Sequence, residues 1–499
     1  MFRHLIFSSN FFLKPGDRFI DFLGNHYNLF RWFVAVTPSS FISYWAMCRA
    51  WRAYRHAIKT VPAYRKFAKG FSGANNFSEI PETDKDNYIR KWPTEERCKR
   101  GKIPAGTVVD ESSGSSGTPY NWVRSPQERH VSHMLVSLFA RYCFPHKRIF
   151  TINAFSMGSW ATGLNMGIAL QNNGLVKNIG PDADKIFDTL AFWGSGYNYI
   201  LCGYPPFLKY LVDASREMNF PLEDYLLFGL VGGEGMSEGL RDYLLPYFRK
   251  VYSGYGATDL EIGIAGETPL SVAIRREART NEKLRRALFG DDPRLPMVFQ
   301  YNPLMHEVEV NDKKELVFTI SRLNVLSPRI RYNIHDEGGV MSFENLVGIC
   351  HASGFDIKAM LASESECTPR LPFIWVYGRS DSTISLMGAN IYPEDIEQCL
   401  YEEDELARIT RSFCIGLYEE GGEARPEFSF EVTCEITDEL ADLFREKIPA
   451  RLATFNKDFN EAMHEHAGTL VPVIKLYPEG TGIFAKDKGR IKQLRIVQR

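Results

Sequence analysis

Residues 226–256 alternate between strand-like and helix-like segments, with glycines between them. LLFGLVGG (226–233) is apolar and ends in glycines, MSEGLRDYLLPYF (236–248) has the apolar spacing of a helix, and KVYSGYG (250–256) is strand-like again. Ser237 is a residue type that caps helix N-termini. This order is typical of a βαβ unit, whose two strands run parallel. The segment therefore predicts an α/β fold with a mostly parallel sheet.

Elements of the same kinds are expected along the rest of the chain. HEVEV (306–310) and ELVFTISR (315–322) alternate as a pair of antiparallel strands. The other predicted elements before residue 377 are helices at 44–67, interrupted at Pro62, and at 128–143, and a strand at 148–155. The later ones are helices at 392–403, with Pro393 in the first turn, and 438–455, and strands at 427–436 and 469–477. We therefore expect a large domain, 1–377, and a smaller α/β domain, 378–499.

The composition excludes some classes of partner. Lysine plus arginine (59) nearly balances aspartate plus glutamate (61), so no nucleic-acid partner is expected. The nine cysteines form no C-x-x-C pair, which is typical of reduced thiols and predicts a cytoplasmic protein. Cys350, His351 and Cys367 match no zinc spacing, and we expect no metal there.

The first 70 residues are predicted to be helical and are rich in aromatic side chains. The most apolar stretch, 29–47, is interrupted by Arg31 and Pro38 and has no run long enough to span a bilayer. We expect these aromatic side chains to pack onto the large domain. A peripheral membrane contact, which exposed aromatic and basic residues would favour, is the alternative left open.

The segment DESSGSSGTPYNW (110–122) is concentrated in serine and glycine. Such composition suits a linker or surface turn. It also suits a phosphate-binding loop, because glycines let successive backbone N–H groups turn inward and hydroxyl groups add donors. The P-loop spacing and its Lys-Ser/Thr pair are absent, as is the G-x-G-x-x-G fingerprint. The segment alone leaves both readings open.

Four further segments follow this one in a fixed order. They are YSGYGATDLE (252–261), RIRYNIHDEGG (329–339), YGRSDSTISLMGANIYPEDIE (377–397) and GTGIFAKDKGRIKQLR (480–495). Together with IPETDKDNYI (80–89), FSMGSWATGLNMG (155–167) and VGGEGMSEGLR (231–241), the set resembles the adenylate-forming superfamily of acyl-CoA synthetases, adenylation domains and luciferases. Within it the chain is most similar to the phenylacetate-CoA ligase branch and related capsule-biosynthesis proteins. The resemblance runs from about residue 50 to the C-terminus.

The resemblance implies a large adenylate-forming domain, a mobile C-terminal domain and a nucleotide site. It places Thr258 in catalysis and Asp259, where glutamate is usual, on Mg²⁺. Asp336 would bind the ribose, and Tyr255 would flank adenine. The complete set of implied ATP-binding residues is Ser112, Ser113, Gly114, Ser115, Ser116, Gly117, Thr118, Gly233, Glu234, Tyr255, Gly256, Ala257, Thr258, Asp336 and Arg379.

The C-terminal part departs from the family's pattern. The resemblance implies a hinge at Asp381. Relatives carry a catalytic lysine in a Ser-Gly-Lys pattern, but here Arg490 stands in its place, so Lys488 or Lys492 is expected to serve. Many relatives also end the Ser/Gly loop with lysine, where this chain has Tyr120. The acyl pocket is expected to use Phe155, Trp160 and Gly163, which favours an aromatic or apolar acid.

The activity implied is activation of a small-molecule carboxylic acid with Mg-ATP to an acyl adenylate, followed by transfer to a thiol. Coenzyme A is the expected acceptor. Transfer to a carrier protein or to an amine, and a non-catalytic nucleotide-binding homologue, remain the alternatives. The sequence leaves open which acid is used and the oligomeric state, a homodimer included.

Overall fold

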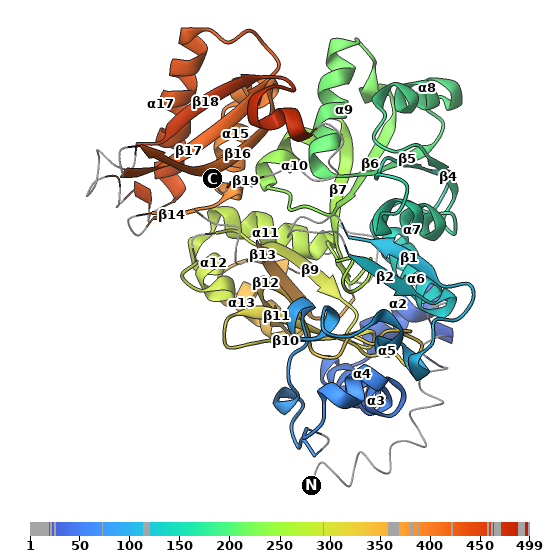
Figure 1. Ribbon diagram of the computed structural model, residues 1–499. Coiled ribbons are helices and arrows are strands. Elements are labelled where there is room, and N and C mark those ends of the chain that lie inside the picture. The colour runs from blue at the N-terminus through green and yellow to red at the C-terminus, as the bar shows by residue number, and fades with distance from the viewer. Residues whose placement is uncertain are drawn as a thin grey trace.

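The computed structural model describes residues 19, 22–23, 26–71, 73–112, 120–292, 294–357, 369–379, 384–386, 389–420, 423–456, 459–460, 463, 471–487 and 495–497. Its centre is an 11-stranded sheet, around which most of the helices pack (Figure 1). The order across this sheet is β10-β11-β12-β13-β9-β8-β7-β6-β5-β3-β4. The predicted α/β fold class is confirmed.

One end of the sheet is parallel. It consists of β3 (Ile149–Asn153), β4 (Leu175–Asn178), β5 (Asn198–Gly203), β6 (Leu226–Gly232) and β7 (Phe248–Tyr255). Helices α7 (Ala161–Leu170), α8 (Ala183–Trp193), α9 (Pro205–Glu217) and α10 (Glu238–Leu244) connect these strands. Ser237 caps α10 as predicted, because its Oγ accepts a hydrogen bond from the Leu240 N–H at 3.1 Å.

The other end of the sheet is antiparallel, so the prediction of a mostly parallel sheet was wrong. Its strands are β8 (Ala265–Gly266), β9 (Met297–Tyr301), β10 (His306–Val310), β11 (Glu315–Ile320), β12 (Tyr332–Met341) and β13 (Phe373–Arg379). For β10 and β11 the physical reason is the length of their connection. A turn as short as the one between β10 and β11 joins only antiparallel strands, whereas parallel strands need a long crossover.

Both faces of the inner parallel strands β3, β5 and β6 are buried, whereas the edge strand β4 is largely exposed. On β5, Tyr199 and Leu201 join a core cluster that includes residues of α8 and α9. The alternate residues Ile200 and Cys202 join a second cluster with α7 and with α6 (Pro126–Cys143). A strand covered on both faces has to be apolar on both, which explains the unbroken apolar runs of the sequence.

The N-terminal segment forms α2 (Tyr27–Val36), α3 (Ser39–Thr60) and α4 (Pro62–Phe67). Ile42, Trp51 and Tyr54 are buried, so one side of α3 packs as predicted. Trp32 and Phe41 are exposed, so the expectation that the aromatic side chains pack onto the large domain holds for only part of them. Within the described residues, no helix combines the length and apolar character needed to cross a membrane.

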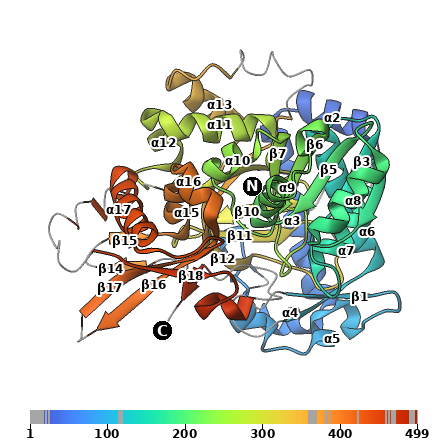
Figure 2. The same cartoon turned by 90° about the horizontal axis from the view of Figure 1, so that it is seen from above.

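The C-terminal part has its own sheet, with the order β18-β17-β16-β19. These strands are β16 (Thr410–Glu420), β17 (Glu423–Val432), β18 (Val473–Pro478) and β19 (Ile496–Val497). They form a separate core with α15 (Pro393–Tyr401) and α17 (Asp438–Phe455). Figures 1 and 2 show this part beside the large sheet. Lys209 Nζ of α9 donates a hydrogen bond to the Thr410 carbonyl at 3.0 Å across the contact.

Candidate active site

A cavity of about 760 Å³ lies beyond the carboxyl ends of β6 and β7. Segments that are far apart in the sequence line it, and they include most of the predicted nucleotide site. Those predicted residues are Ser112, Gly233, Glu234, Tyr255, Gly256, Ala257, Thr258, Asp259 and Asp336. The structure therefore gathers them around a single space.

The Ser/Gly segment begins at the wall of this cavity. Strands β1 (Val108–Glu111) and β2 (Asn121–Arg124) are antiparallel neighbours. Beyond them the Ser112 N–H donates to the Tyr120 carbonyl at 3.0 Å, and the Tyr120 N–H donates to Ser112 Oγ at 2.9 Å. The two ends of the segment are thus held together. The predicted residues Ser113, Gly114, Ser115, Ser116, Gly117 and Thr118 lie outside the described residues.

Tyr120, which stands near the place of the family's loop lysine, has a structural role. Its hydroxyl oxygen accepts a hydrogen bond from Arg97 at 2.7 Å and donates to the Ile89 carbonyl at 3.3 Å. Its ring lies 5.0 Å from that of Trp122. The side chain therefore anchors the base of the segment.

Buried arginines fix the loop that carries Thr258 and Asp259. Arg124 donates to the Thr258 carbonyl at 2.5 Å, and Arg329 donates to the Asp259 carbonyl at 2.7 Å. Both arginines are buried. A loop whose carbonyl groups are each held by a buried cation keeps one conformation, which suits a binding site.

A third arginine fixes the end of the same loop. The Glu261 carboxylate accepts a hydrogen bond from Arg322 at 2.5 Å, and another from Ser132 at 2.6 Å. His306 Nε2 lies within hydrogen-bonding distance of the other carboxylate oxygen. These partners hold the pKa of Glu261 well below its usual range, against the opposing effect of burial.

Lys85 is a cation of the cavity to which the sequence had assigned no role. It lies in the segment 80–89, begins a short helical turn (Lys85–Ile89) and lines the cavity. Its Nζ lies 3.2 Å from Asp259 Oδ2. Asp84 caps this turn by accepting from the Asp86 and Asn87 N–H groups at 2.7 and 2.6 Å. The cap fixes the backbone from which Lys85 projects.

One carboxylate oxygen of Asp259, Oδ1, is placed to accept a metal ion. Its Oδ2 contacts Lys85 and accepts a hydrogen bond from the Tyr332 hydroxyl at 3.0 Å. Among the described residues no partner of Oδ1 is found, and no group of three or more His, Cys, Asp or Glu could hold a metal. Mg²⁺ is commonly held by one or two carboxylates together with substrate phosphates. Asp259 Oδ1 and the Thr258 hydroxyl fit that pattern.

Asp336 and Tyr255 form another part of the site. The Tyr255 hydroxyl donates to Asp336 Oδ2 at 2.6 Å, and its ring packs 5.6 Å from that of Phe299. Burial, and then the Asp336 carboxylate, raise the pKa of Tyr255 well above its usual value. In the β12–β13 pair, Asp336 stands opposite Arg379, so the two predicted ribose or phosphate ligands are register partners. The side chain of Arg379 lies outside the described residues.

Gly233 needs to be glycine. Its φ is +84°, and a Cβ there would lie 2.7 Å from Tyr204 Cε1. This conformation turns the chain between β6 and α10 along the cavity wall, where Glu234 follows.

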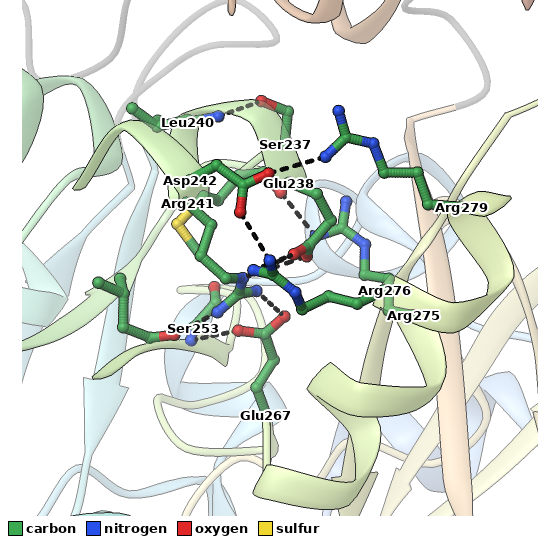
Figure 3. A network of polar contacts seen from close by, with 12 residues as sticks. Ser237, Glu238, Leu240, Arg241, Asp242, Ser253, Glu267, Arg275, Arg276 and Arg279 are labelled. Atoms are coloured by element: carbon green, nitrogen blue, oxygen red, sulfur yellow. Dashed lines mark hydrogen bonds and ion pairs between the residues drawn. The ribbon is translucent and has the colours of Figure 1, made fainter. Parts of the chain in front are cut away.

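A buried ionic network lies around the start of α10, which follows this turn (Figure 3). Arg241 bonds to Glu238 at 3.0 Å and to Glu267 at 2.7 Å, and Arg275 bonds to Glu238 at 2.8 Å. Glu267 also accepts from the Ser253 N–H at 2.8 Å. The network joins α10, β7 and α11 (Pro269–Thr280), so it fixes the elements that lead into and out of the cavity.

Another part of the cavity is apolar. Phe155 and Trp160, which were predicted for the acyl pocket, line it with Met166, Tyr204 and Phe139. Gly163 is not among the lining residues, because it faces the chain at 155–156, where a Cβ would lie 2.1 Å from the Ser156 carbonyl oxygen. On the far side α2 contributes Tyr27, Phe30 and Val34. The predicted hinge residue Asp381 and the candidate catalytic lysines Lys488 and Lys492 lie outside the described residues.

The sequence matches no known family model and no curated protein. Solved structures do match. One match is a 2-hydroxyisobutyryl-CoA ligase in its postadenylation state, in complex with R3-HIB-AMP. The TM-score is 0.66 at 13% sequence identity, and the superposition covers 94% of this chain and 91% of that chain. The chain has the fold of the adenylate-forming ligases. The expected fold is therefore confirmed, and membership of the superfamily and of its phenylacetate-CoA ligase branch stays a prediction.

The same ligase has been solved in other states, and these match the adenylate-forming fold of this chain less closely. In complex with 2-HIB-AMP and CoA in the thioesterification state, the TM-score is 0.54, at 14% identity, over 93% of this chain and 91% of that chain. In an open conformation it is 0.51, at 13% identity, over 91% of each chain. The arrangement of this chain thus resembles the postadenylation state more than the others.

Proposed function

We propose that this protein is an AMP-forming ligase of the phenylacetate-CoA ligase-like branch, which activates a carboxylic acid with Mg-ATP to an acyl adenylate. The observation that carries the proposal is the convergence of Ser112, Thr258, Asp259 and Asp336 on one cavity. The triphosphate would lie against the segment that begins at Ser112, and Asp336 would accept the ribose hydroxyl groups. Localisation in the cytoplasm belongs to the same proposal.

The difficulty of the reaction is electrostatic, because a carboxylate has to approach the α-phosphate of a polyanion. Mg²⁺ bound through Asp259 and Thr258 would neutralise part of that charge. Lys85, whose Nζ lies beside Asp259, would be a second source of positive charge at the cavity wall. We assign to it the role that the loop lysine has in many relatives.

The acid is proposed to be aromatic or apolar. Phe155, Trp160 and Phe139 offer apolar walls, and Met166 offers a polarizable one. The acceptor is proposed to be coenzyme A, which the matching ligase binds in its thioesterification state. A carrier-protein thiol or an amine is the competing acceptor, and a non-catalytic nucleotide-binding protein is the competing class.

The region 378–499 is proposed to move between the two half-reactions about Asp381, with Lys488 or Lys492 reaching the cavity during adenylation. The proposal is supported by the 2-hydroxyisobutyryl-CoA ligase, whose postadenylation and thioesterification states match this chain with different TM-scores, 0.66 and 0.54. Replacing Lys488, Arg490 and Lys492 singly by alanine tests which cation acts, since only the acting one should slow adenylation.

The deciding experiment measures pyrophosphate release from Mg-ATP with a panel of carboxylic acids, with and without coenzyme A. We expect acid-dependent release, and an adenylate that hydroxylamine traps. Asp336→Asn should abolish it, whereas Asp312→Asn, at an exposed position away from the cavity, should not. Release of ADP and phosphate would contradict the proposal. ATP binding without pyrophosphate release would favour the non-catalytic class.

A further inference from the structure

An exposed aromatic surface lies on the N-terminal helices α2 and α3. Trp32 and Val36 are one turn apart on α2 and are 61% and 50% exposed. Phe41 and Tyr44 are one turn apart at the start of α3 and are 53% and 48% exposed. We refer to these four side chains as the lead patch. Single exposed apolar residues are ordinary, but a group of this kind marks an interaction surface.

Ring contacts join the two helices of the lead patch. Phe41 lies 6.0 Å from Trp45, and Phe33 of α2 lies 6.4 Å from the same Trp45 ring. Only Thr37 and Pro38 separate α2 from α3. The exposed side chains therefore project from one packed pair of helices and not from independent segments.

The chain around the lead patch is basic. Residues 22–78 contain eight lysines and arginines and no aspartate or glutamate. On α3 the sequence positions 41, 44, 48, 52, 55 and 59 follow one another at steps of three or four, so they lie on one face of the helix. The exposed Phe41 and Tyr44 occupy the first part of this face, and Cys48 in its middle is buried. Arg52 and Arg55, which are half-buried, and Lys59, which is exposed, occupy the last part. One described carboxylate touches the turn, since Ser39 donates a hydrogen bond to Glu344.

A second exposed aromatic site lacks this charge. Phe192 on α8 is 83% exposed, but α8 carries Asp184 and Asp188 with Lys185 as its one basic residue. The combination of exposed aromatic side chains with an acid-free basic helix is thus a property of α2 and α3. Tryptophan and tyrosine favour the boundary between water and lipid, and lysine and arginine favour anionic headgroups.

The inner face of α2 contributes to the cavity. Tyr27, Phe30 and Val34 line its apolar part, on the same helix whose outer face carries Trp32 and Val36. In Figure 1, α2 and α3 lie far from the strands β16 to β18 of the C-terminal part. Contact through the lead patch would bring its partner next to the apolar end of the cavity and leave the C-terminal part uncovered.

We propose that the lead patch docks the protein on an anionic lipid surface. The aromatic side chains enter the headgroup boundary, and the basic half of the α3 face lies against lipid phosphates. This inference does not depend on the proposed function. If both hold, an apolar acid dissolved in the lipid lies beside the end of the cavity that α2 lines.

The test is co-sedimentation of the full-length protein with vesicles of phosphatidylcholine alone, or with phosphatidylglycerol added. We expect binding to the anionic vesicles and weakening by salt. Trp32→Ser with Phe41→Ser, and separately Arg52→Gln with Lys59→Gln, should each lower the partition coefficient about tenfold or more. Phe192→Ser is the matched control and should bind as the wild type does.

Folding and activity are followed in parallel. Circular dichroism checks that each variant is folded, and pyrophosphate release with a water-soluble acid should be unchanged, because the lead patch lies outside the cavity lining. Equal binding to neutral and anionic vesicles would overturn the proposal. Absence of vesicle binding would overturn it as well. If sedimentation velocity then shows self-association, and Trp32→Ser with Phe41→Ser removes it, the lead patch binds a second copy of the protein instead.

Discussion

The Tyr255 hydroxyl donates a hydrogen bond to Asp336 Oδ2 at 2.6 Å. The two residues are 81 positions apart, one at the end of β7 and the other within β12. The Tyr255 ring packs against Phe299 and Phe318. The tyrosine predicted to flank adenine therefore also orients the carboxylate predicted to bind ribose, and the two predicted functions are physically coupled.

Tyr255→Phe tests this coupling, because it keeps the ring and removes only the hydrogen bond. A hydrogen bond to a charged group contributes about 1.5–3 kcal/mol. We expect the KM for ATP to rise about tenfold with a smaller change in kcat, since the ring still packs and the Asp336 carboxylate loses one of the bonds that orient it. Steady-state pyrophosphate release measures both constants. An unchanged KM would mean that Asp336 does not need the tyrosine.

Lys85→Ala should slow adenylation. A preorganised cation near developing negative charge contributes about 10²-fold to the rate. Lys85→Arg should recover part of the rate, because it keeps the charge but not the geometry. Single-turnover pyrophosphate release is the measurement. Lys66→Ala is the control, since Lys66 is exposed and pairs with Glu96 away from the cavity. Equal rates in Lys85→Ala and wild type would remove Lys85 from the site.

The residues that could be predicted are those with a local signal. Ser237 has the chemistry of a helix cap, and the loop 255–259 and Asp336 belong to motifs that keep their order along the chain. Lys85 and Arg329 lie inside two of the quoted segments, 80–89 and 329–339, but nothing in the sequence indicated their roles or that of Arg124. Lys85 meets Asp259, and the arginines meet the 258–259 carbonyls, only after folding. The antiparallel pair at 306–310 and 315–322 was predicted and is confirmed, but the rest of the antiparallel half was missed for a similar reason. Its strand β13 pairs with β9 and β12 across long stretches of chain, and no local periodicity specifies that pairing.

Gly233→Ala should both destabilise the protein and weaken ATP binding. A side chain at φ +84° costs about 1–2 kcal/mol, and the new Cβ would also meet Tyr204. Gly235→Ala is the matched control, because nothing lies within 4 Å of a Cβ there and its φ is not positive. Thermal unfolding with and without ATP separates the two effects. Equal destabilisation in both variants would contradict the conformational argument.

Stability should depend on the protonation of Glu307. Burial, with the nearby Glu309 carboxylate, raises its pKa to about 8. The folded state therefore keeps this proton up to about pH 8, whereas the unfolded chain loses it near pH 4.5. The free energy of unfolding consequently falls as the pH rises between those values. Glu307→Gln should raise Tm by a few degrees at pH 8.5 and change it little at pH 4.5.

Glu309→Gln is the control for that effect. Glu309 accepts a hydrogen bond from Arg331 at 2.9 Å, so removing its charge should lower Tm instead of raising it. Differential scanning calorimetry across the pH range distinguishes the two variants. A Glu307→Gln variant whose Tm gain does not vary with pH would show that volume or packing, and not ionisation, sets the difference.

Arg294 holds both flanks of the segment that contains the predicted hinge. Its guanidinium carbon lies 4.2 Å from the ring centroid of Tyr377, in β13, and 4.4 Å from that of Tyr392, which precedes α15. It also pairs with Asp292 at 2.7 Å and with Glu337 at 2.9 Å. Cation–π contacts of this kind contribute about 0.5–2 kcal/mol each. Arg294 thus stabilises the described position of α15 beside the large sheet.

Arg294→Ala should therefore affect the two half-reactions unequally. We expect the rate of adenylation to fall about tenfold, because the large sheet and α15 lose a shared contact. The rate of acyl transfer from supplied acyl adenylate to coenzyme A should stay the same or rise. Arg286→Ala is the control, since Arg286 is largely exposed and pairs with Glu282 on its own helix. Separate assays of pyrophosphate release and thioester formation give the comparison. Equal slowing of both steps would show that Arg294 supports the nucleotide site itself and not the position of the C-terminal part.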